Sequence, residues 1–299
     1  MSEIDFDGVP HYREHFLDGS HSDYQASDFV ILPIPYDSTT SFKTGSRHGP
    51  KAIIVASRQL EDYDIEMNRD VSSVGIYTAP EIEPHVDGPK YMIDRIERAV
   101  RRSSESGKIV GVIGGEHTVT IGAVRHFKNV FPDLSVLYLD AHADLRNEYM
   151  SSPWGHASVA RRIHEICPIV EVGVRSLSVE ENEFIKSERI PIVFWPTSLT
   201  TECLADTVLQ SLSKHVYVSI DLDVFDPSIM SSVGTPEPDG MLWQEVLKLL
   251  RSVTQERRVV GFDVVELSPS EGTESCTFTA AKLVHKMVGY VSETNHGSS

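Results

Sequence analysis

The sequence has few cysteines and no long apolar segment. Its three cysteines lie far apart among 299 residues and form no CxxC pair. The odd number and wide spacing argue against a disulfide framework and against a thiolate metal site. No apolar run approaches the roughly 20 residues that cross a bilayer, and the acidic start MSEIDFDGVPHYREHF lacks the features of a secretory signal. We therefore expect a cytoplasmic protein that does not associate with membranes.

Basic residues are also scarce relative to acidic ones. Lys and Arg together number 27, Asp and Glu number 44, and the formal net charge is −17. A surplus of negative charge disfavours contact with phosphates, so the composition argues against nucleic acid as a partner. It is compatible with a small cationic ligand.

No repeat, low-complexity linker or long block of like charges divides the chain. With 40% hydrophobic residues it can bury a large core, and α/β folds of this length often form one domain. We expect a polar lead-in over residues 1–27, one catalytic domain over 28–291 and a frayed tail over 292–299.

Short, continuous apolar runs predict the strands of this domain. They occupy residues 29–34, 109–113, 134–139, 169–174, 190–195, 216–220 and 259–265. Runs without polar alternation are typical of strands buried on both faces, as in a parallel sheet. Segments with helical patterning lie between them, at residues 49–63, 89–106, 118–130, 179–188 and 242–256. The alternation predicts an α/β fold with a doubly wound, mainly parallel sheet flanked by helices.

Three of these apolar runs end in acidic or imidazole side chains. The motifs are GGEH, DAHAD and DLDVFDP, and they supply His117, Asp140, His142, Asp144, Asp221 and Asp223. Ligands of open parallel sheets bind beyond the carboxyl ends of the strands. Alternate residues of an extended chain also point to the same side. So many acidic groups in one crevice would repel one another unless cations were bound.

The donor set indicates which cations these would be. Two imidazoles and four carboxylates are enough for two ions that share bridging carboxylates, and oxygen with imidazole ligands favours Mn²⁺ over a structural zinc site. Each motif alone has an ordinary explanation: DAHAD could be a polar loop, and His117 could cap a helix. Three such strand ends in one chain are hard to obtain by accident. We therefore predict a site for two Mn²⁺ ions.

As a set, the motifs resemble those of the ureohydrolase family of arginases and agmatinases. The matching segments are PYDSTTSFKTGSRHGP, GGEH, DAHAD, SIDLDVFDP, GTPEPDG and DVVELSP, in order through most of the chain. The resemblance, greatest to archaeal-type agmatinases, implies an arginase-like catalytic domain with an eight-stranded sheet and homo-oligomers, trimers or hexamers. It implies one Mn²⁺ held by His117, Asp140, Asp144 and Asp221. It implies a second held by Asp140, His142, Asp221 and Asp223.

The resemblance also implies a reaction and its catalytic residues. Hydroxide bridging the two metals would attack the guanidinium carbon of a small cationic guanidino substrate. Glu266 matches the family glutamate that grips the guanidinium, where a carboxylate accepts charge-assisted hydrogen bonds. His156, in WGHAS, matches the loop histidine associated with proton transfer to the leaving group. The predicted catalytic residues are therefore His156, Glu266 and Asp223, the last of which is also a metal ligand.

The substrate is less closely defined by the motifs. The family pattern of arginases includes an asparagine and an aspartate that recognise the carboxylate and the amine of the α-amino acid. In this sequence Arg146 stands at the place of the asparagine and Ser178 at that of the aspartate. GTPEPDG resembles the agmatinase form of its loop, although Asp239 stands where agmatinases commonly have glycine. We therefore expect hydrolysis of agmatine to urea and putrescine, or of aminopropylagmatine to urea and spermidine.

Alternatives to this substrate, and to catalysis itself, remain open. Arg146 would favour a carboxylate if it faced the substrate tail, as in a formimidoylglutamase or a guanidino-acid hydrolase. Alternatively, it pairs with an acidic neighbour such as Glu148. A catalytically silent, metal-binding relative is a further alternative, but such a protein would more naturally have lost a ligand, and all six are present.

Overall fold

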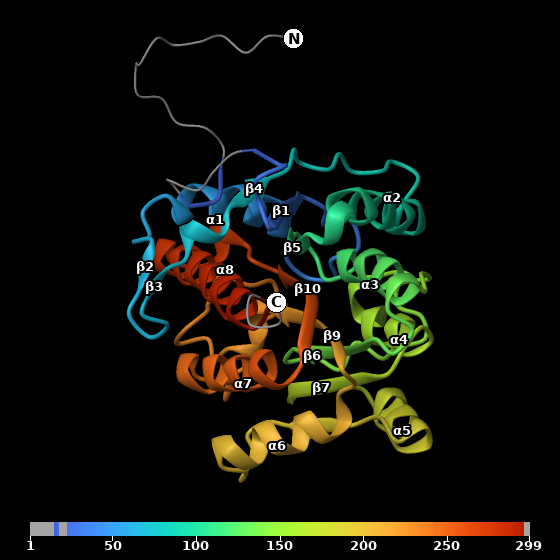
Figure 1. Cartoon of the computed structure of the whole chain (residues 1–299). Helices are drawn as coiled ribbons and strands as arrows, with labels where there is room; N and C mark the ends of the chain where they lie inside the picture. Colours follow the sequence, from blue (N-terminus) through green and yellow to red (C-terminus); the bar gives the residue numbers. More distant parts are fainter. Residues whose placement is uncertain (1–14, 18–22, 296–299) are drawn as a thin grey trace.

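A parallel β-sheet of eight strands runs through the middle of the molecule (Figure 1). The structure is a computed structural model, and it describes residues 15–17 and 23–295. The sheet has the order β4-β1-β5-β10-β9-β6-β7-β8, and every neighbouring pair in it is parallel. Its strands are β1 (Phe29–Ile34), β4 (Ile76–Thr78), β5 (Ile109–Gly114), β6 (Ser135–Leu139), β7 (Ile169–Val174), β8 (Ile192–Phe194), β9 (His215–Asp221) and β10 (Arg258–Val265). The predicted eight-stranded, mainly parallel sheet is thus confirmed.

Helices cover both faces of this sheet, which confirms the doubly wound arrangement. The α-helices are α1 (Gly49–Ser57), α2 (Pro89–Ser103), α3 (Val119–Val130), α4 (Val159–His164), α5 (Val179–Glu188), α6 (Thr201–Ser211), α7 (Trp243–Glu256) and α8 (Glu274–Asn295). One apolar core contains residues of α1, α6, α7 and α8, and a second contains residues of α2, α3, α4 and α5. Figure 1 shows these two sets of helices on opposite sides of the sheet.

Shorter elements lie in the connections. A separate antiparallel hairpin is formed by β2 (Tyr63–Asp64) and β3 (Arg69–Asp70). The 3₁₀ helices are η1 (Ser46–His48), η2 (Ser72–Val74), η3 (Glu105–Gly107), η4 (His156–Ser158), η5 (Leu222–Val224) and η6 (Pro269–Glu271).

The hairpin is joined to α8 by buried charged groups. Lys286 Nζ donates to Asp64 Oδ1 at 2.8 Å and to Glu66 Oε2 at 2.7 Å, and Tyr290 donates to the same Glu66 oxygen at 2.8 Å. The lysine and Asp64 are both buried. These contacts fasten a small, exposed hairpin to the longest helix of the described chain.

Both ends of the chain differ in detail from the expected boundaries. Phe16 and Leu17, within the predicted polar lead-in, are completely buried in the first core, and their amides donate to Thr78 and Ser57. Residues 1–14 and 18–22 of that segment lie outside the described residues. Helix α8 extends to Asn295, so the expected frayed tail begins too early. The polar residues after Val291 have no apolar pattern of their own, yet the helix continues through them as far as Asn295.

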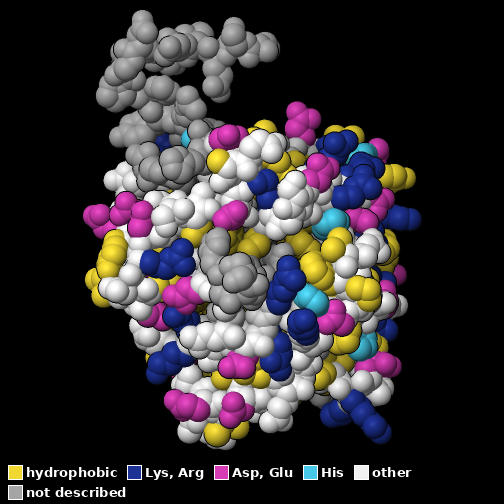
Figure 2. Space-filling model, in the orientation of Figure 1, with side chains coloured by type: hydrophobic (Ala, Val, Ile, Leu, Met, Phe, Trp, Pro, Cys, Tyr) yellow, Lys and Arg dark blue, Asp and Glu magenta, His cyan; other side chains and the backbone are white. Residues whose placement is uncertain are grey.

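The surface carries charges of both signs. Figure 2 shows acidic and basic side chains interspersed over one face, with hydrophobic side chains between them. Among the described residues, we find no helix with the length and apolar character needed to span a membrane.

Candidate active site

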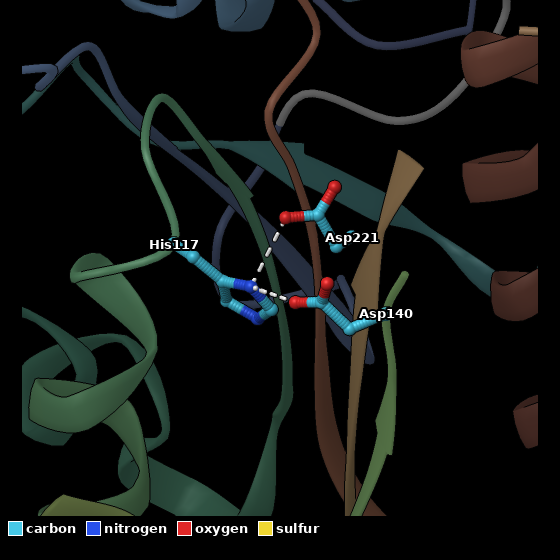
Figure 3. A group of neighbouring side chains, drawn as sticks. All are labelled: His117, Asp140 and Asp221. Atoms are coloured by element: carbon cyan, nitrogen blue, oxygen red, sulfur yellow. Dashed lines mark ion pairs between the residues drawn. The ribbon is translucent and has the colours of Figure 1, made fainter. Parts of the chain in front are cut away.

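The predicted ligands lie at the ends of neighbouring strands. His117 follows β5, Asp140 follows β6, and Asp221 is the last residue of β9. These strands and β10, whose end is followed by Glu266, are contiguous in the sheet order β5-β10-β9-β6. Because all four are parallel, their carboxyl ends meet at one edge, which is where ligands bind in such sheets. Figure 3 shows His117, Asp140 and Asp221 pointing toward one another from this edge.

The turn after β5 is unusually close to the end of β1. A Cβ atom at Gly115 would lie only 2.1 Å from the carbonyl oxygen of Tyr36, so glycine is required there. The amide of Gly115 donates to Ile34 O at 2.9 Å, and that of Glu116 donates to Tyr36 O at 2.7 Å. These contacts fix the direction in which the chain delivers His117 to the site.

Two groups of donor atoms with metal-ligand geometry form at the strand ends. In the first, His117 Nδ1 lies 3.0 Å from Asp140 Oδ2 and 3.1 Å from Asp221 Oδ2, and Asp144 Oδ2 is 3.8 Å from the same nitrogen. In the second, His142 Nδ1 lies 2.9 Å from Asp223 Oδ2 and 3.5 Å from Asp140 Oδ1. Asp140 belongs to both groups, one oxygen in each. The six residues predicted as ligands are therefore brought together.

Burial makes this cluster unfavourable without cations. It raises the pKa of Asp144 and of Asp221 well above the usual range, and nearby carboxylates raise both further. Asp140 Oδ2 is buried and has no hydrogen-bond partner among the described residues. A buried, unpaired carboxylate oxygen is costly, and a divalent ion would satisfy it. The set of carboxylates and imidazoles, with no thiolate, suits two hard or borderline cations.

A chain of hydrogen bonds orients His117 for this purpose. Ser219 donates its hydroxyl to Asp263 Oδ1 at 2.7 Å, so its oxygen is free to accept from His117 Nε2, 2.8 Å away. In the neutral imidazole that binds a cation, the proton would sit on Nε2 and the Nδ1 lone pair would face the carboxylates. Tyr138 also lies flat against the imidazole, with ring centroids 4.4 Å apart, and donates to Asp144 Oδ2 at 2.8 Å.

Arg175 stabilises the backbone around the second group of donor atoms, that of His142 and Asp223. The sequence did not suggest this role. Its guanidinium donates to six backbone carbonyls, at distances of 2.7 to 3.3 Å: those of Gly173, Asp223, Val224, Phe225, Glu237 and Pro238. Three of these belong to the segment that carries Asp223, and two belong to the GTPEPDG loop. In that loop, Glu237 Oε1 lies 3.7 Å from His142 Nε2. This half-buried guanidinium thus joins Asp223 to the loop beside His142.

A cavity of about 240 Å³ opens onto these ligands. Its walls include residues of both metal groups, together with His156 and Glu266. Oε1 of Glu266 accepts the backbone amide of His117 at 2.7 Å, and the Glu266 amide donates to Gly115 O at 2.8 Å. Burial, and then the charge of Glu116, raises the pKa of Glu266 to about 8. A cation bound next to this carboxylate would offset that cost.

Comparison with known proteins agrees with this arrangement. A model of the arginase family matches residues 27–289, which include all six candidate ligands. The chain belongs to the arginase family. It is 39% identical to the N(1)-aminopropylagmatine ureohydrolase of Thermus thermophilus, over 89% of this chain and 91% of that protein. It is 36% identical to the agmatinase of Pyrococcus horikoshii, over 93% and 97%. The crystal structure of the agmatine ureohydrolase of Thermoplasma volcanium superposes with a TM-score of 0.88, at 29% identity, over 97% of this chain and 98% of that one.

His156, the candidate proton-transfer residue of this arginase-family site, lies in the cavity wall at the start of η4. Its amide donates to Thr39 Oγ1 at 3.0 Å, and its ring nitrogens lie 3.4 Å from Thr39 Oγ1 and 3.2 Å from Ser41 Oγ. Burial lowers the pKa of His156 to about 4. The imidazole is therefore neutral near pH 7 and is contacted by a hydroxyl on each side.

Arg146 and Ser178 also line the cavity, as their places in the arginase-family pattern suggest. Of the two alternatives for Arg146, the structure shows pairing with an acidic residue, but the partner is Glu181 rather than a neighbour such as Glu148, with Arg146 Nε 4.0 Å from Glu181 Oε2. Glu181 is 35 residues away in the sequence, at the start of α5, so spacing along the chain could not indicate it. Ser178 caps that helix, and it donates its hydroxyl to Glu181 at 2.7 Å.

Proposed function

We propose that this protein hydrolyses agmatine, or agmatine extended at its amine by an aminopropyl group, to urea and a polyamine, with two Mn²⁺ ions bound. The chain is an agmatinase-type ureohydrolase, a hydrolase of guanidino compounds. The single observation that carries the proposal is the position of Asp140, which faces both His117 and His142, two residues of the cavity wall that also contains Glu266.

The residues present fit two ions with shared carboxylate ligands. One would be held by His117, Asp140, Asp144 and Asp221. The other would be held by Asp140, His142, Asp221 and Asp223. When bound, such a pair lowers the pKa of a water molecule, so that hydroxide is available near neutral pH. The side chains of the cavity perform the other tasks of the reaction.

Glu266 binds and orients the substrate in this proposal. The planar guanidinium offers N–H donors in a fork, and a carboxylate accepts them in a charge-assisted pair. The His117 amide donates a hydrogen bond of 2.7 Å to Glu266 Oε1. This bond fixes the position of the Glu266 carboxylate relative to the first group of ligands. The guanidinium carbon is therefore held next to the metal groups, and orientation of this kind lowers the barrier to attack.

His156 moves the proton that the leaving amine requires. A neutral imidazole can accept a proton on one nitrogen and release one from the other. The hydroxyls of Thr39 and Ser41 hold the ring within the cavity wall. Because its pKa is low, His156 is neutral near pH 7 and can accept a proton before it passes one to the leaving amine.

The cationic tail of the substrate is inferred from relatives and from the missing amino-acid recognition groups. The Thermus thermophilus relative is named for aminopropylagmatine and the Pyrococcus horikoshii relative for agmatine. Assembly into trimers or hexamers, and a cytoplasmic location, are part of the same proposal. A carboxylate-bearing substrate is the second candidate, because Arg146 lines the cavity.

A substrate panel tests the proposal. The Mn²⁺-loaded protein would be incubated with agmatine, aminopropylagmatine, arginine, 4-guanidinobutanoate and formimidoylglutamate, and substrate loss followed by mass spectrometry. We expect one of the two cationic polyamine precursors to have the highest kcat/KM and to release urea. Preference for formimidoylglutamate or 4-guanidinobutanoate would contradict the proposal and favour the second candidate. Turnover of none of the five would favour a catalytically silent protein.

A further inference from the structure

Two oppositely charged side chains lie together in the cavity wall. The Arg146 and Glu181 side chains approach to 4.0 Å, and the Arg146 guanidinium lies 5.1 Å from the centre of the Tyr149 ring. All three residues line the cavity that contains Glu266. Neither Arg146 nor Glu181 contacts the candidate metal-ligand atoms in these interactions, so their charges are available to act on a substrate tail.

Glu181 is the fixed member of the pair. It is only 4% exposed. Its carboxylate accepts hydrogen bonds from the amides of Leu145 at 3.0 Å and Ser178 at 2.6 Å, and from the Ser178 hydroxyl at 2.7 Å. The bond from the Ser178 amide belongs to the capping box that begins α5. The Arg146 side chain is 35% exposed and is steadied by the aromatic ring on one side and the carboxylate on the other.

The pairing changes what Arg146 can recognise. An unpaired arginine in a cavity wall would bind a carboxylate in bidentate fashion and repel an ammonium. With Glu181 beside it, the two charges cancel. Lys43 also lines the cavity, and it forms an ion pair with Glu271. Apart from the ligands, His156 and Glu266, the charged residues of the described cavity wall are therefore balanced.

We propose that Glu181 and Arg146 are the specificity-determining pair of the site. Glu181 neutralises Arg146, so that the cavity accepts a guanidino compound with an ammonium tail rather than one with a carboxylate tail. This inference rests on the proposed function and identifies the residues that set its substrate class.

The test compares agmatine with 4-guanidinobutanoate, which carry the same guanidino group and tails of opposite charge. Glu181→Gln removes the negative charge and leaves Arg146 free, so the ratio of kcat/KM for agmatine to that for 4-guanidinobutanoate should fall at least about tenfold, since like charges repel across a contact. Glu180→Gln is the matched control. Glu180 is exposed, is absent from the cavity wall and carries the same charge, so its loss should leave the ratio within about threefold.

Arg146→Met tests the same pair by removing its positive member, and it leaves the capping box of Ser178 and Glu181 intact. It should free Glu181 and raise the ratio at least about fivefold, mainly through a lower KM for agmatine. If Glu181→Gln does not fold, Arg146→Met decides alone. Unchanged ratios in the folded variants would overturn the specificity pair while the wild-type protein still hydrolysed agmatine. Failure of the wild-type protein on agmatine and aminopropylagmatine would instead overturn the proposed function.

Discussion

Asp140 Oδ2 lies 3.0 Å from His117 Nδ1, and the two residues come from the ends of different strands. This carboxylate oxygen is completely buried. The other oxygen of Asp140 faces His142. One carboxylate therefore joins both halves of the candidate metal centre. Its removal should affect both ions rather than one.

The first prediction follows from this contact. Asp140→Asn removes the shared charge, so the purified variant should retain less than one Mn²⁺ per chain, compared with two in the wild-type protein, and should lose urea release. Saturating Mn²⁺ should raise the unfolding temperature of the wild type, because about 2.7 kcal/mol of stabilisation accompanies an ion at 100 times its Kd. Elemental analysis and thermal unfolding measure both effects. Asp239→Asn, at an exposed position, is the control; full metal content in Asp140→Asn would disprove the shared-ligand role.

The second prediction separates His156 from the ligands. His156→Asn should keep both metal ions and fold normally, because the ring contacts hydroxyls rather than the donor groups. Its kcat should fall roughly a hundredfold, the usual scale for lost acid–base assistance, with a smaller change in KM. Steady-state kinetics with metal analysis on the same sample measure this. Loss of metal would mean that His156 is a ligand, and an unchanged kcat would mean that it is a loop residue.

The third prediction concerns Arg175, which reaches six carbonyls around Asp223 and Glu237. Lysine has a single nitrogen and cannot reproduce this fork. Arg175→Lys should therefore weaken Mn²⁺ binding about 10- to 100-fold, the scale reported for partners that orient ligands, and the effect should fall on one of the two ions. Equilibrium dialysis would resolve it. Arg98→Lys, at an exposed site on α2, is the control and should bind Mn²⁺ with the affinity of the wild type. Equal Mn²⁺ affinities in Arg175→Lys and Arg98→Lys would show that the Arg175 hydrogen bonds are not needed for metal binding.

The fourth prediction concerns stability and pH. Burial would raise the pKa of Asp64, but the hydrogen bond and charge of Lys286 outweigh it and hold the pKa below the ordinary 3.8; the pKa of Glu66 is likewise held below 4.5. Because the folded-state values are depressed, the stabilisation is complete above about pH 5 and is lost as the pH falls through them. Lys286→Met should lower the free energy of unfolding by about 3 kcal/mol at pH 7, since it removes the nearest cation from a buried carboxylate and leaves only the more distant Lys282, 3.6 Å away.

Urea unfolding of the wild type and of Lys286→Met between pH 7 and pH 3 measures this difference. It should shrink toward acid, where the carboxyl groups become neutral in both proteins. Lys248→Met, at an exposed position on α7, should change the stability little at any pH. A difference that stayed constant with pH would point to packing rather than to charge.

The strand ends could be predicted because a buried parallel strand is a continuous apolar run, and a carboxylate directly after it is conspicuous. Helix α8 could not be predicted in this way. Residues 283–292 are all buried, so the segment lacks the polar face that gives a surface helix its period. Strand β4 has only three residues, too few to show a pattern.

The residues that support the ligands were missed for a different reason. Asp263 lies inside the apolar run of β10, and its partner Ser219 lies 44 positions earlier, on β9. Their contact follows from the register of β9 against β10, which a sequence does not state. The same applies to Arg146 and Glu181, whose separation along the chain conceals their contact in the cavity.

The place of β10 in the sheet has a consequence for how the protein is made. It is the last strand in the sequence, yet it lies between β5 and β9. Until it is synthesised, β4-β1-β5 and β9-β6-β7-β8 are two half-sheets, each with an unpaired edge. His117 belongs to one half, while Asp140 and Asp221 belong to the other. A nascent chain that ends before residue 258 should therefore expose both edges and depend on chaperones, and it should be unable to assemble the first metal group. Metal uptake would then report that β10 has joined the two half-sheets.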